Sequence, residues 1–180
     1  MNSGNIVLAD TKTGFIDSGI KWFSNSTFSH SFVTMPDTLG FPMCIEATSG
    51  GVDMTRFDTG YQNNLNEGYQ VWSINVPQAT KDAALQQIIN DLEMSYGILQ
   101  YPWFMWRRIN LLFKRDIKSK DNWNTSGMIC SQLCVAYLIA CGLSYVLAGY
   151  GMGSISPQDL QDIFMAHPEV FSLQESVRLP

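Results

Sequence analysis

The chain has 180 residues, of which 46% are apolar and only 15% are charged, and this composition excludes an intrinsically disordered protein. The length fits one domain over residues 1–180 with a single hydrophobic core. The net charge of −5 at pH 7 argues against a protein that binds nucleic acid over its whole surface, because such proteins need basic residues to contact phosphates.

Four segments in the first 76 residues are rich in β-branched and aromatic residues, and Gly, Asn, Asp and Pro separate them. This pattern is typical of strands joined by turns. The predicted strands are NIVLA (5–9), FSHSFVTM (28–35), PMCIEAT (42–48) and YQVWSINV (69–76).

Helical periodicity begins after these strands. Apolar residues recur at helical spacing over 81–96, with Thr80 as the expected N-cap and Gly97 as the expected stop. A second pattern over about 127–140 is apolar nearly all round and predicts a buried helix, and a third helix is expected to begin at Ser156. The order of elements predicts an α+β fold, with a small antiparallel sheet packed on helices.

The four cysteines (Cys44, Cys130, Cys134 and Cys141) are expected to be reduced thiols. The start of the chain has neither the basic residues nor the apolar run of a secretory signal, and no stretch reaches the ~18 apolar residues of a membrane span. We therefore expect a cytoplasmic or phage-encoded protein, a virion component included. The cysteines and the two histidines show no zinc spacing, so neither a metal nor another cofactor is expected.

Cys130 is the strongest candidate for chemistry. It falls in the first turns of the predicted buried helix, where free N–H groups and the helix dipole stabilise a thiolate. His30, on a predicted strand, is a candidate base, and Glu46 on the next strand can orient the imidazole if both face the same side. Each residue also has a non-catalytic interpretation. Cys130 can be a small buried hydrophobic residue, His30 a structural histidine, and Glu46 an exposed residue at the edge of the sheet. His167 is the other candidate base.

The chain order of these residues resembles the permuted NlpC/P60 papain-like superfamily. In ordinary papain-like enzymes the cysteine precedes the histidine, whereas here His30 comes first, then Glu46, and Cys130 last. The permuted group includes YiiX-like thiol hydrolases and relatives of lecithin retinol acyltransferase. The resemblance implies a circularly permuted papain-like fold with the nucleophile at the N-terminus of a buried helix.

Three short motifs carry this resemblance across residues 4–142. Gly-Asn-Ile at 4–6 is similar to the Gly-Asp-Ile start of the family, and Cys-Ser-Gln-Leu at 130–133 is similar to its Cys-Ser-Glu-Leu sequence. Tyr96-Gly97, before an aromatic stretch, is similar to the Tyr-Asp segment that precedes the cysteine helix. Asn5 and Gln132 are the departures from the pattern.

The resemblance implies a cysteine hydrolase or acyltransferase with a Cys130, His30 and Glu46 triad. The thiolate attacks a carbonyl, the histidine moves the proton, and the backbone N–H of Cys130 stabilises the oxyanion. The substrates implied are amides or esters, among them cell-wall peptides of peptidoglycan and lipid-linked acyl groups. The alternative is a catalytically silent papain-like module that serves as a structural or binding part, for example of a phage particle.

An aromatic and basic insert at about 102–122 carries a net charge of +4. Trp103, Trp106, Arg107 and Arg108 interleave in it, a composition suited to an anionic surface or a partner protein, if the tryptophans are exposed. The alternative is a lid or packing segment whose tryptophans belong to the core. We expect no nucleic-acid partner, because no fold signature for one accompanies the charges.

Overall fold

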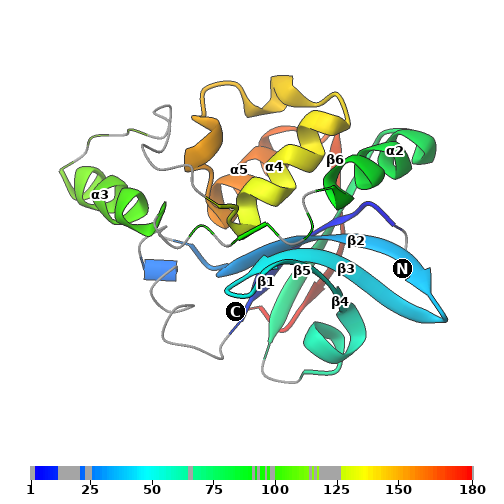
Figure 1. The fold of residues 1–180 in the computed structure, drawn as a ribbon. Helices are drawn as coiled ribbons and strands as arrows, with labels where there is room; N and C mark the ends of the chain where they lie inside the picture. Colours follow the sequence, from blue (N-terminus) through cyan, green and yellow to red (C-terminus); the bar gives the residue numbers. More distant parts are fainter. Residues whose placement is uncertain are drawn as a thin grey trace.

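The computed structural model describes residues 3–11, 21–22, 26–64, 67–90, 92, 94–95, 97, 100–113, 115, 117 and 127–179 (Figure 1). Tyr96 lies outside these described residues, as do residues 114, 116 and 118–122 of the predicted insert. The helices that the structure describes include none that is long and apolar enough to cross a membrane.

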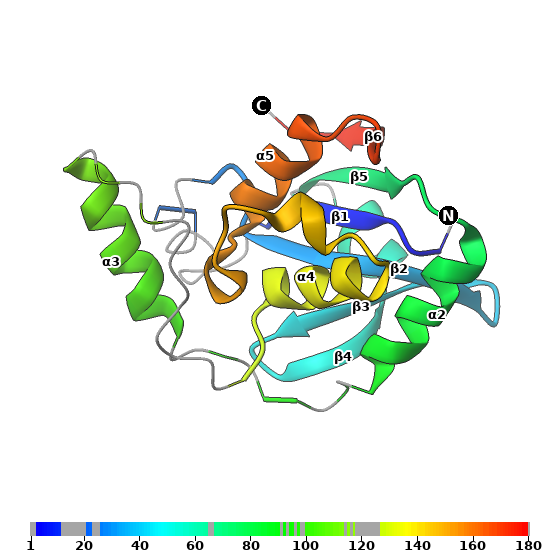
Figure 2. The same ribbon diagram turned by 90° about the horizontal axis from the view of Figure 1, so that it is seen from above.

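Six strands form one antiparallel sheet in the order β4-β3-β2-β1-β5-β6, within the part of the chain that the structure describes (Figures 1 and 2). The four predicted strands correspond to β1, β2, β3 and β5. The two edge strands, β4 and β6, were not predicted from the sequence. The bounds are β1 Ile6–Asp10, β2 His30–Thr38, β3 Phe41–Thr48, β4 Gly51–Arg56, β5 Gly68–Ile74 and β6 Phe171–Val177.

Helices α2 (Gln78–Ile89), α4 (Cys130–Ala140) and α5 (Pro157–Ala166) cover one face of the sheet, which Figure 2 shows from above. Alternate residues of the strands point toward these helices and form the main core, among them Ile6, Leu8, Val33, Ile45 and Ala47. The predicted α+β fold class, with an antiparallel sheet packed on helices, is therefore confirmed.

A second, smaller core lies on the opposite face of the sheet. The intervening residues of the same strands point there, and they pack against Phe57 and against Tyr61 of the π-helix η1 (Asp58–Gln62). The sheet-borne members of this core are Val7, Ala9, Phe32, Cys44, Tyr69 and Val71. Both faces of the central strands are therefore buried, although the sheet is antiparallel.

The helix boundaries differ from the predictions by a few residues. Helix α2 begins at Gln78, after Pro77 in an extended conformation, so Thr80 lies inside the helix rather than capping it, and the helix ends at Ile89 rather than near 96. Helix α4 begins at Cys130 itself. Helix α5 begins as predicted, with Ser156 as its N-cap. Short 3-10 turns, η3 (Ser144–Leu147) and η4 (Met152–Ser154), connect α4 to α5.

The predicted insert begins with helix α3 (Tyr101–Leu112), which lies beside the other helices rather than on the sheet (Figure 1). Trp103 and Phe104 are buried in a separate apolar cluster with Ile117 and Ile129. Because Ile129 directly precedes α4, this cluster packs the insert helix against the end of α4 that carries Cys130.

Candidate active site

His30 and Glu46 lie side by side on neighbouring antiparallel strands. Phe32 of β2 pairs with Glu46 of β3, so His30, two residues before Phe32, points to the same face of the sheet. The distance between His30 Nε2 and Glu46 Oε2 is 2.7 Å. The expected juxtaposition of the histidine and the carboxylate is therefore present.

Two further side chains hold the carboxylate of Glu46, which is almost wholly buried. Tyr61 donates its hydroxyl hydrogen to Glu46 Oε2 at 2.6 Å, and Thr55 of β4 donates to Glu46 Oε1. Burial by itself would raise the pKa of Glu46. The hydrogen bond and charge of His30, followed by the hydrogen bonds from Thr55 and Tyr61, instead lower this pKa to about 2.

Cys130 completes the arrangement from helix α4, which packs on the sheet. It is the first residue of α4, His30 is the first residue of β2, and the two side chains are hydrogen-bonded where these elements begin. Burial favours the neutral thiol, but the hydrogen bond and charge of His30 and the N–H and hydroxyl of Ser31 lower the pKa of Cys130. The site therefore favours a thiolate.

The imidazole of His30 shows the matching shift. Burial alone would lower its pKa, whereas the hydrogen bonds and charges of Cys130 and Glu46 raise it to about 10. A lowered thiol pKa beside a raised imidazole pKa favours a thiolate and imidazolium ion pair over the two neutral groups. Such a pair supplies both a nucleophile and a proton donor.

The other cysteines lie in the opposite environment. All four cysteines are free and buried. Burial raises the pKa of Cys44 to about 12, and it also raises the pKa of Cys134 and of Cys141. Cys134 and Cys141 belong to the main core between the sheet and the helices. Cys130 is therefore the one cysteine whose surroundings stabilise the thiolate.

Hydrogen bonds from neighbouring segments fix the first turn of α4. Gln132 Oε1 accepts from the N–H of Ile129 at 3.2 Å and from Nε2 of the buried Gln100 at 3.0 Å. Ser131 Oγ donates to the carbonyl of Ile155 at 2.6 Å. These contacts leave the N–H groups of the first turn, which have no partner within a helix, beside the thiol of Cys130.

Sequence reasoning missed three residues of this site: Ser31, Thr55 and Tyr61. Ser31 is next to His30, so strand alternation was the signal for its position on the helix face. Thr55 belongs to a strand that was not predicted, and Tyr61 belongs to a π-helix, for which the sequence gives no periodic signal. His167, the alternative base, is instead hydrogen-bonded to Glu169, with 3.0 Å between His167 Nδ1 and Glu169 Oε1.

The structure corrects the expected exposure of the insert residues. Trp103 is only 2% exposed and belongs to the apolar cluster. Arg107 is 8% exposed and forms a bidentate ion pair with Asp159 of α5. Trp106 and Arg108 are half-buried. Trp103 and Arg107 thus pack the insert onto the domain. Neither is available to an outside surface, because the apolar cluster covers Trp103 and the ion pair with Asp159 buries Arg107.

Comparisons with known proteins give a likeness of fold. No family model matches the chain, and no curated protein matches it. Among solved structures, the chain is similar to the crystal structure of the metalloprotein YiiX from Escherichia coli O157:H7, with a TM-score of 0.62 and 15% sequence identity over 97% of each chain. This likeness over the full length agrees with the papain-like fold expected from the sequence.

Proposed function

We propose that the protein is a papain-like cysteine hydrolase or acyltransferase that cleaves an amide or ester bond through an acyl-enzyme on Cys130. One observation carries this proposal: a continuous chain of hydrogen bonds from Cys130 through His30 to Glu46, in which the thiol pKa is lowered. Glu46 takes the orienting role, and Thr55 and Tyr61 hold its carboxylate in place.

The reaction proceeds in two halves. The Cys130 thiolate attacks the substrate carbonyl carbon and forms a C–S bond, while the carbonyl oxygen gains negative charge beside the free N–H groups at the start of α4. The imidazolium of His30 gives its proton to the leaving amine or alcohol as the C–N or C–O bond of the substrate breaks, which leaves the acyl group on Cys130 as a thioester. His30 then takes a proton from water or from a second acceptor, which attacks the thioester and releases Cys130.

The structural neighbour YiiX is described as a metalloprotein. In the described part of this chain, no group of three or more His, Cys, Asp and Glu side chains is placed to hold a metal ion. His30 is instead committed to Glu46 and Cys130 through its hydrogen bonds. These residues do not fit a metal, so the proposed reaction includes no metal step.

The test is the reaction of each cysteine with iodoacetamide across pH, followed residue by residue by mass spectrometry. We expect Cys130 to react well below the ~8.5 pKa of free cysteine, and we expect Cys44, Cys134 and Cys141 to remain unmodified in the folded protein. His30→Gln should reduce the rate at neutral pH by about tenfold or more, because the imidazolium is lost. His167→Gln is the matched control.

The same experiment tests the catalytically silent alternative. If Cys130 reacts no faster at neutral pH than a thiol of ordinary pKa, or if His30→Gln leaves the rate unchanged, the thiolate does not form. The papain-like module would then serve in binding or assembly, and the proposed function would be wrong.

A further inference from the structure

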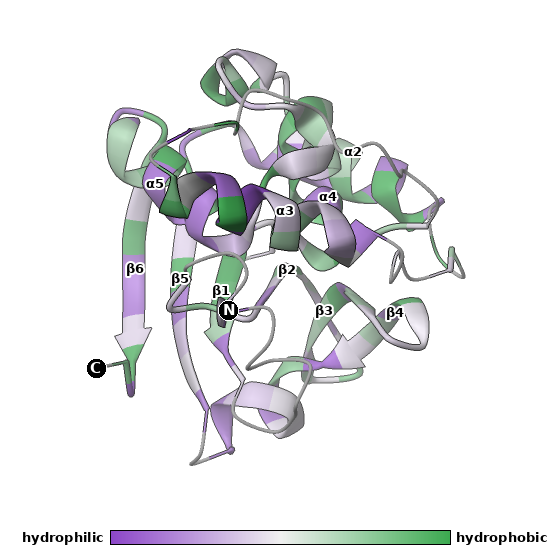
Figure 3. Ribbon diagram, turned by 90° about the vertical axis from the view of Figure 1, so that its left-hand side faces the viewer, coloured by the Kyte–Doolittle hydropathy of each residue, from purple (hydrophilic) through white to green (hydrophobic). Residues whose placement is uncertain are grey.

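Helix α3 has two apolar faces, of which the domain covers only one. Trp103, Phe104 and Arg107 point into the domain and are buried. A second set of apolar side chains lies in the open at helical spacing, namely Met105 (43% exposed), Ile109 (44%), Leu112 (65%) and the following Phe113 (74%). We call these four residues the α3 stripe. Figure 3, in which α3 faces the viewer, shows hydrophobic and hydrophilic residues along this helix.

Basic residues accompany the stripe, and acidic residues are absent from the sequence between Tyr101 and Arg115. Arg108 lies between Met105 and Ile109 in the helix, and Arg115 is exposed just after Phe113. The segment 102–122 carries +4 in a chain whose net charge is −5, so the remainder carries −9. The charge of this segment therefore favours an anionic surface as its partner.

We propose that the α3 stripe binds the surface of an anionic lipid bilayer, with its apolar side chains in the headgroup boundary and Arg108 and Arg115 against the lipid phosphates. An amphipathic helix with large apolar side chains beside Arg and Lys is the kind of element that lies in the plane of a membrane surface. Anionic headgroups supply the complementary charge. A neutral apolar partner would leave the arginines without a role.

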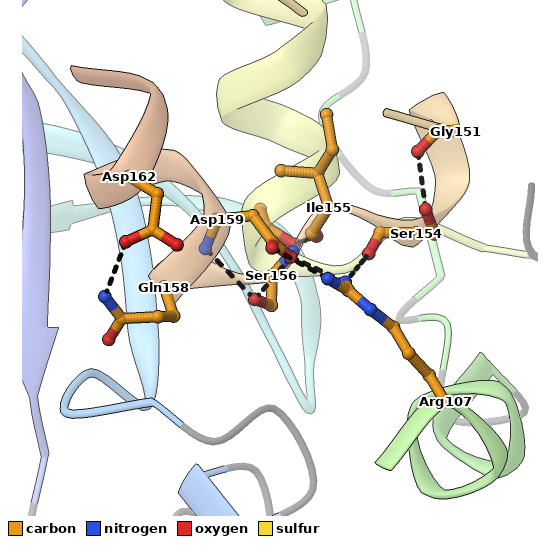
Figure 4. A network of polar contacts seen from close by, with 9 residues as sticks. Arg107, Gly151, Ser154, Ile155, Ser156, Gln158, Asp159 and Asp162 are labelled. Atoms are coloured by element: carbon orange, nitrogen blue, oxygen red, sulfur yellow. Dashed lines mark hydrogen bonds and ion pairs between the residues drawn. The ribbon is translucent and has the colours of Figure 1, made fainter. Parts of the chain in front are cut away.

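The helix is held firmly enough to orient the whole domain on such a surface. Arg107 Nη1 and Nη2 contact the two carboxylate oxygens of Asp159 at 2.6 and 2.8 Å, and Nη1 also donates to the carbonyl of Ser154 at 2.8 Å (Figure 4). At the other end, Gln100 donates to the carbonyl of Gly127 at 2.9 Å. These contacts tie α3 to α5 and to the segment that precedes α4, so the helix and the domain are expected to bind a surface as one unit.

The experiment is co-sedimentation of the full chain with vesicles of phosphatidylcholine alone or mixed with phosphatidylglycerol. Using Cys130→Ser keeps the result independent of the proposed reaction, so the two proposals can fail separately. We expect binding to the mixed vesicles that weakens as salt rises from about 0.1 to 1 M, over which the Debye length falls from ~10 to ~3 Å. Ile109→Glu should weaken this binding by about tenfold or more.

Leu173→Glu is the matched control, because Leu173 on β6 is 46% exposed, as Ile109 is 44%, and lies away from the stripe. It should bind the vesicles as the parent protein does. Circular dichroism checks that both variants fold. Equal binding to phosphatidylcholine vesicles, no binding to either kind, or the same loss in both variants would each overturn the proposal. Dimers in solution that Ile109→Glu separates would overturn it also, because a second copy would then cover the stripe.

Discussion

Glu46 shows how a single charged residue is accommodated inside the sheet. A carboxylate buried without partners would cost several kcal/mol and would take up a proton instead. Here three donors surround it, His30, Thr55 and Tyr61, so the charged form is favoured despite burial. Two of these donors come from segments after β3, which means that β4 and η1 complete the surroundings of a residue that β3 places.

Removing one of these donors should have a cost that depends on pH. Tyr61→Phe should lower the free energy of unfolding at neutral pH by about 1.5–3 kcal/mol, because the buried carboxylate loses a charge-assisted hydrogen bond. The pKa of Glu46 is lowered from 4.5 to about 2, so its charge contributes stability above pH 4.5 that is lost as pH falls toward about 2. The penalty of Tyr61→Phe should therefore shrink in acid. Urea unfolding at neutral and acid pH measures it.

The control for this substitution is Tyr145→Phe, because Tyr145 is 58% exposed and lies in η3. It should leave the free energy of unfolding nearly unchanged at every pH. A Tyr61→Phe penalty as large near pH 2 as at neutral pH would show that the hydroxyl matters for packing and not for the charge of Glu46.

Rare residue types made part of the site predictable. The chain has only two histidines, and one of them falls on a strand next to a strand with a carboxylate among apolar residues. Threonines and tyrosines are far more numerous, and nothing in the sequence distinguishes Thr55 or Tyr61 from the others. Their roles depend on strand register and on the turn of η1, which are tertiary properties.

At the scale of elements, the ion pair between Arg107 and Asp159 joins α3 to the start of α5. Asp159 also accepts from the N–H and hydroxyl of Ser156 at 2.8 and 2.7 Å, and the Asp159 N–H donates back to that hydroxyl at 3.2 Å (Figure 4). One carboxylate therefore caps a helix and neutralises a guanidinium at the same time. Because Asp159 has two roles and Arg107 has one, losing Asp159 should cost more stability than losing Arg107.

Removing either partner should reveal this inequality. Asp159→Asn leaves a buried guanidinium uncompensated and weakens the cap of α5, so we expect a loss of about 3–5 kcal/mol in the free energy of unfolding. Arg107→Met leaves Asp159 with Ser156 and the helix dipole, so its cost should be smaller by about 1 kcal/mol or more. Urea unfolding of both variants and of the double variant measures the coupling.

The exposed ion pair of Arg56 and Asp58 provides the control, because Arg56→Met there should change the stability little. If Arg107→Met lowers the free energy of unfolding as much as Asp159→Asn does, Ser156 does not stabilise the carboxylate of Asp159 in the absence of Arg107. The predicted difference between the two variants would then be wrong.

The elements that sequence reasoning missed lie at the sheet edges. β4 (Gly51–Arg56) and β6 (Phe171–Val177) each pair with one strand only, and half of the β4 residues and most of the β6 residues are exposed. Edge strands of this kind lack the apolar runs that made β1, β2, β3 and β5 recognisable. Their pairing depends on the neighbouring strand, so the size of the sheet was underestimated although its type was predicted.

At the scale of the whole molecule, the site links the stability of the fold to pH. Burial would lower the pKa of His30, but Cys130 and Glu46 raise it from 6.5 to about 10. The stability from His30 is therefore complete below pH 6.5 and is lost as pH rises through about 10. Cys130 has the opposite sign, because its thiol pKa is lowered from 9.0: its contribution to stability is complete above pH 9.0 and is lost as pH falls through the lowered pKa.

From pH 9.0 down to the lowered pKa of Cys130 these two effects oppose each other, so the free energy of unfolding of the parent protein should change less steeply with pH there than His30 alone would make it. Cys130→Ser removes the thiolate while His30 keeps Glu46. Its free energy of unfolding should then fall as pH rises above 6.5, by up to about 1.4 kcal/mol per pH unit for the one proton involved. Urea unfolding in small pH steps measures both curves.

Cys141→Ser is the control, because the pKa of Cys141 is raised. This substitution should change the free energy of unfolding by the same amount at each pH below 9.0 and leave the slope against pH unchanged. A parent curve as steep as that of Cys130→Ser would mean that Cys130 holds its proton in the folded protein.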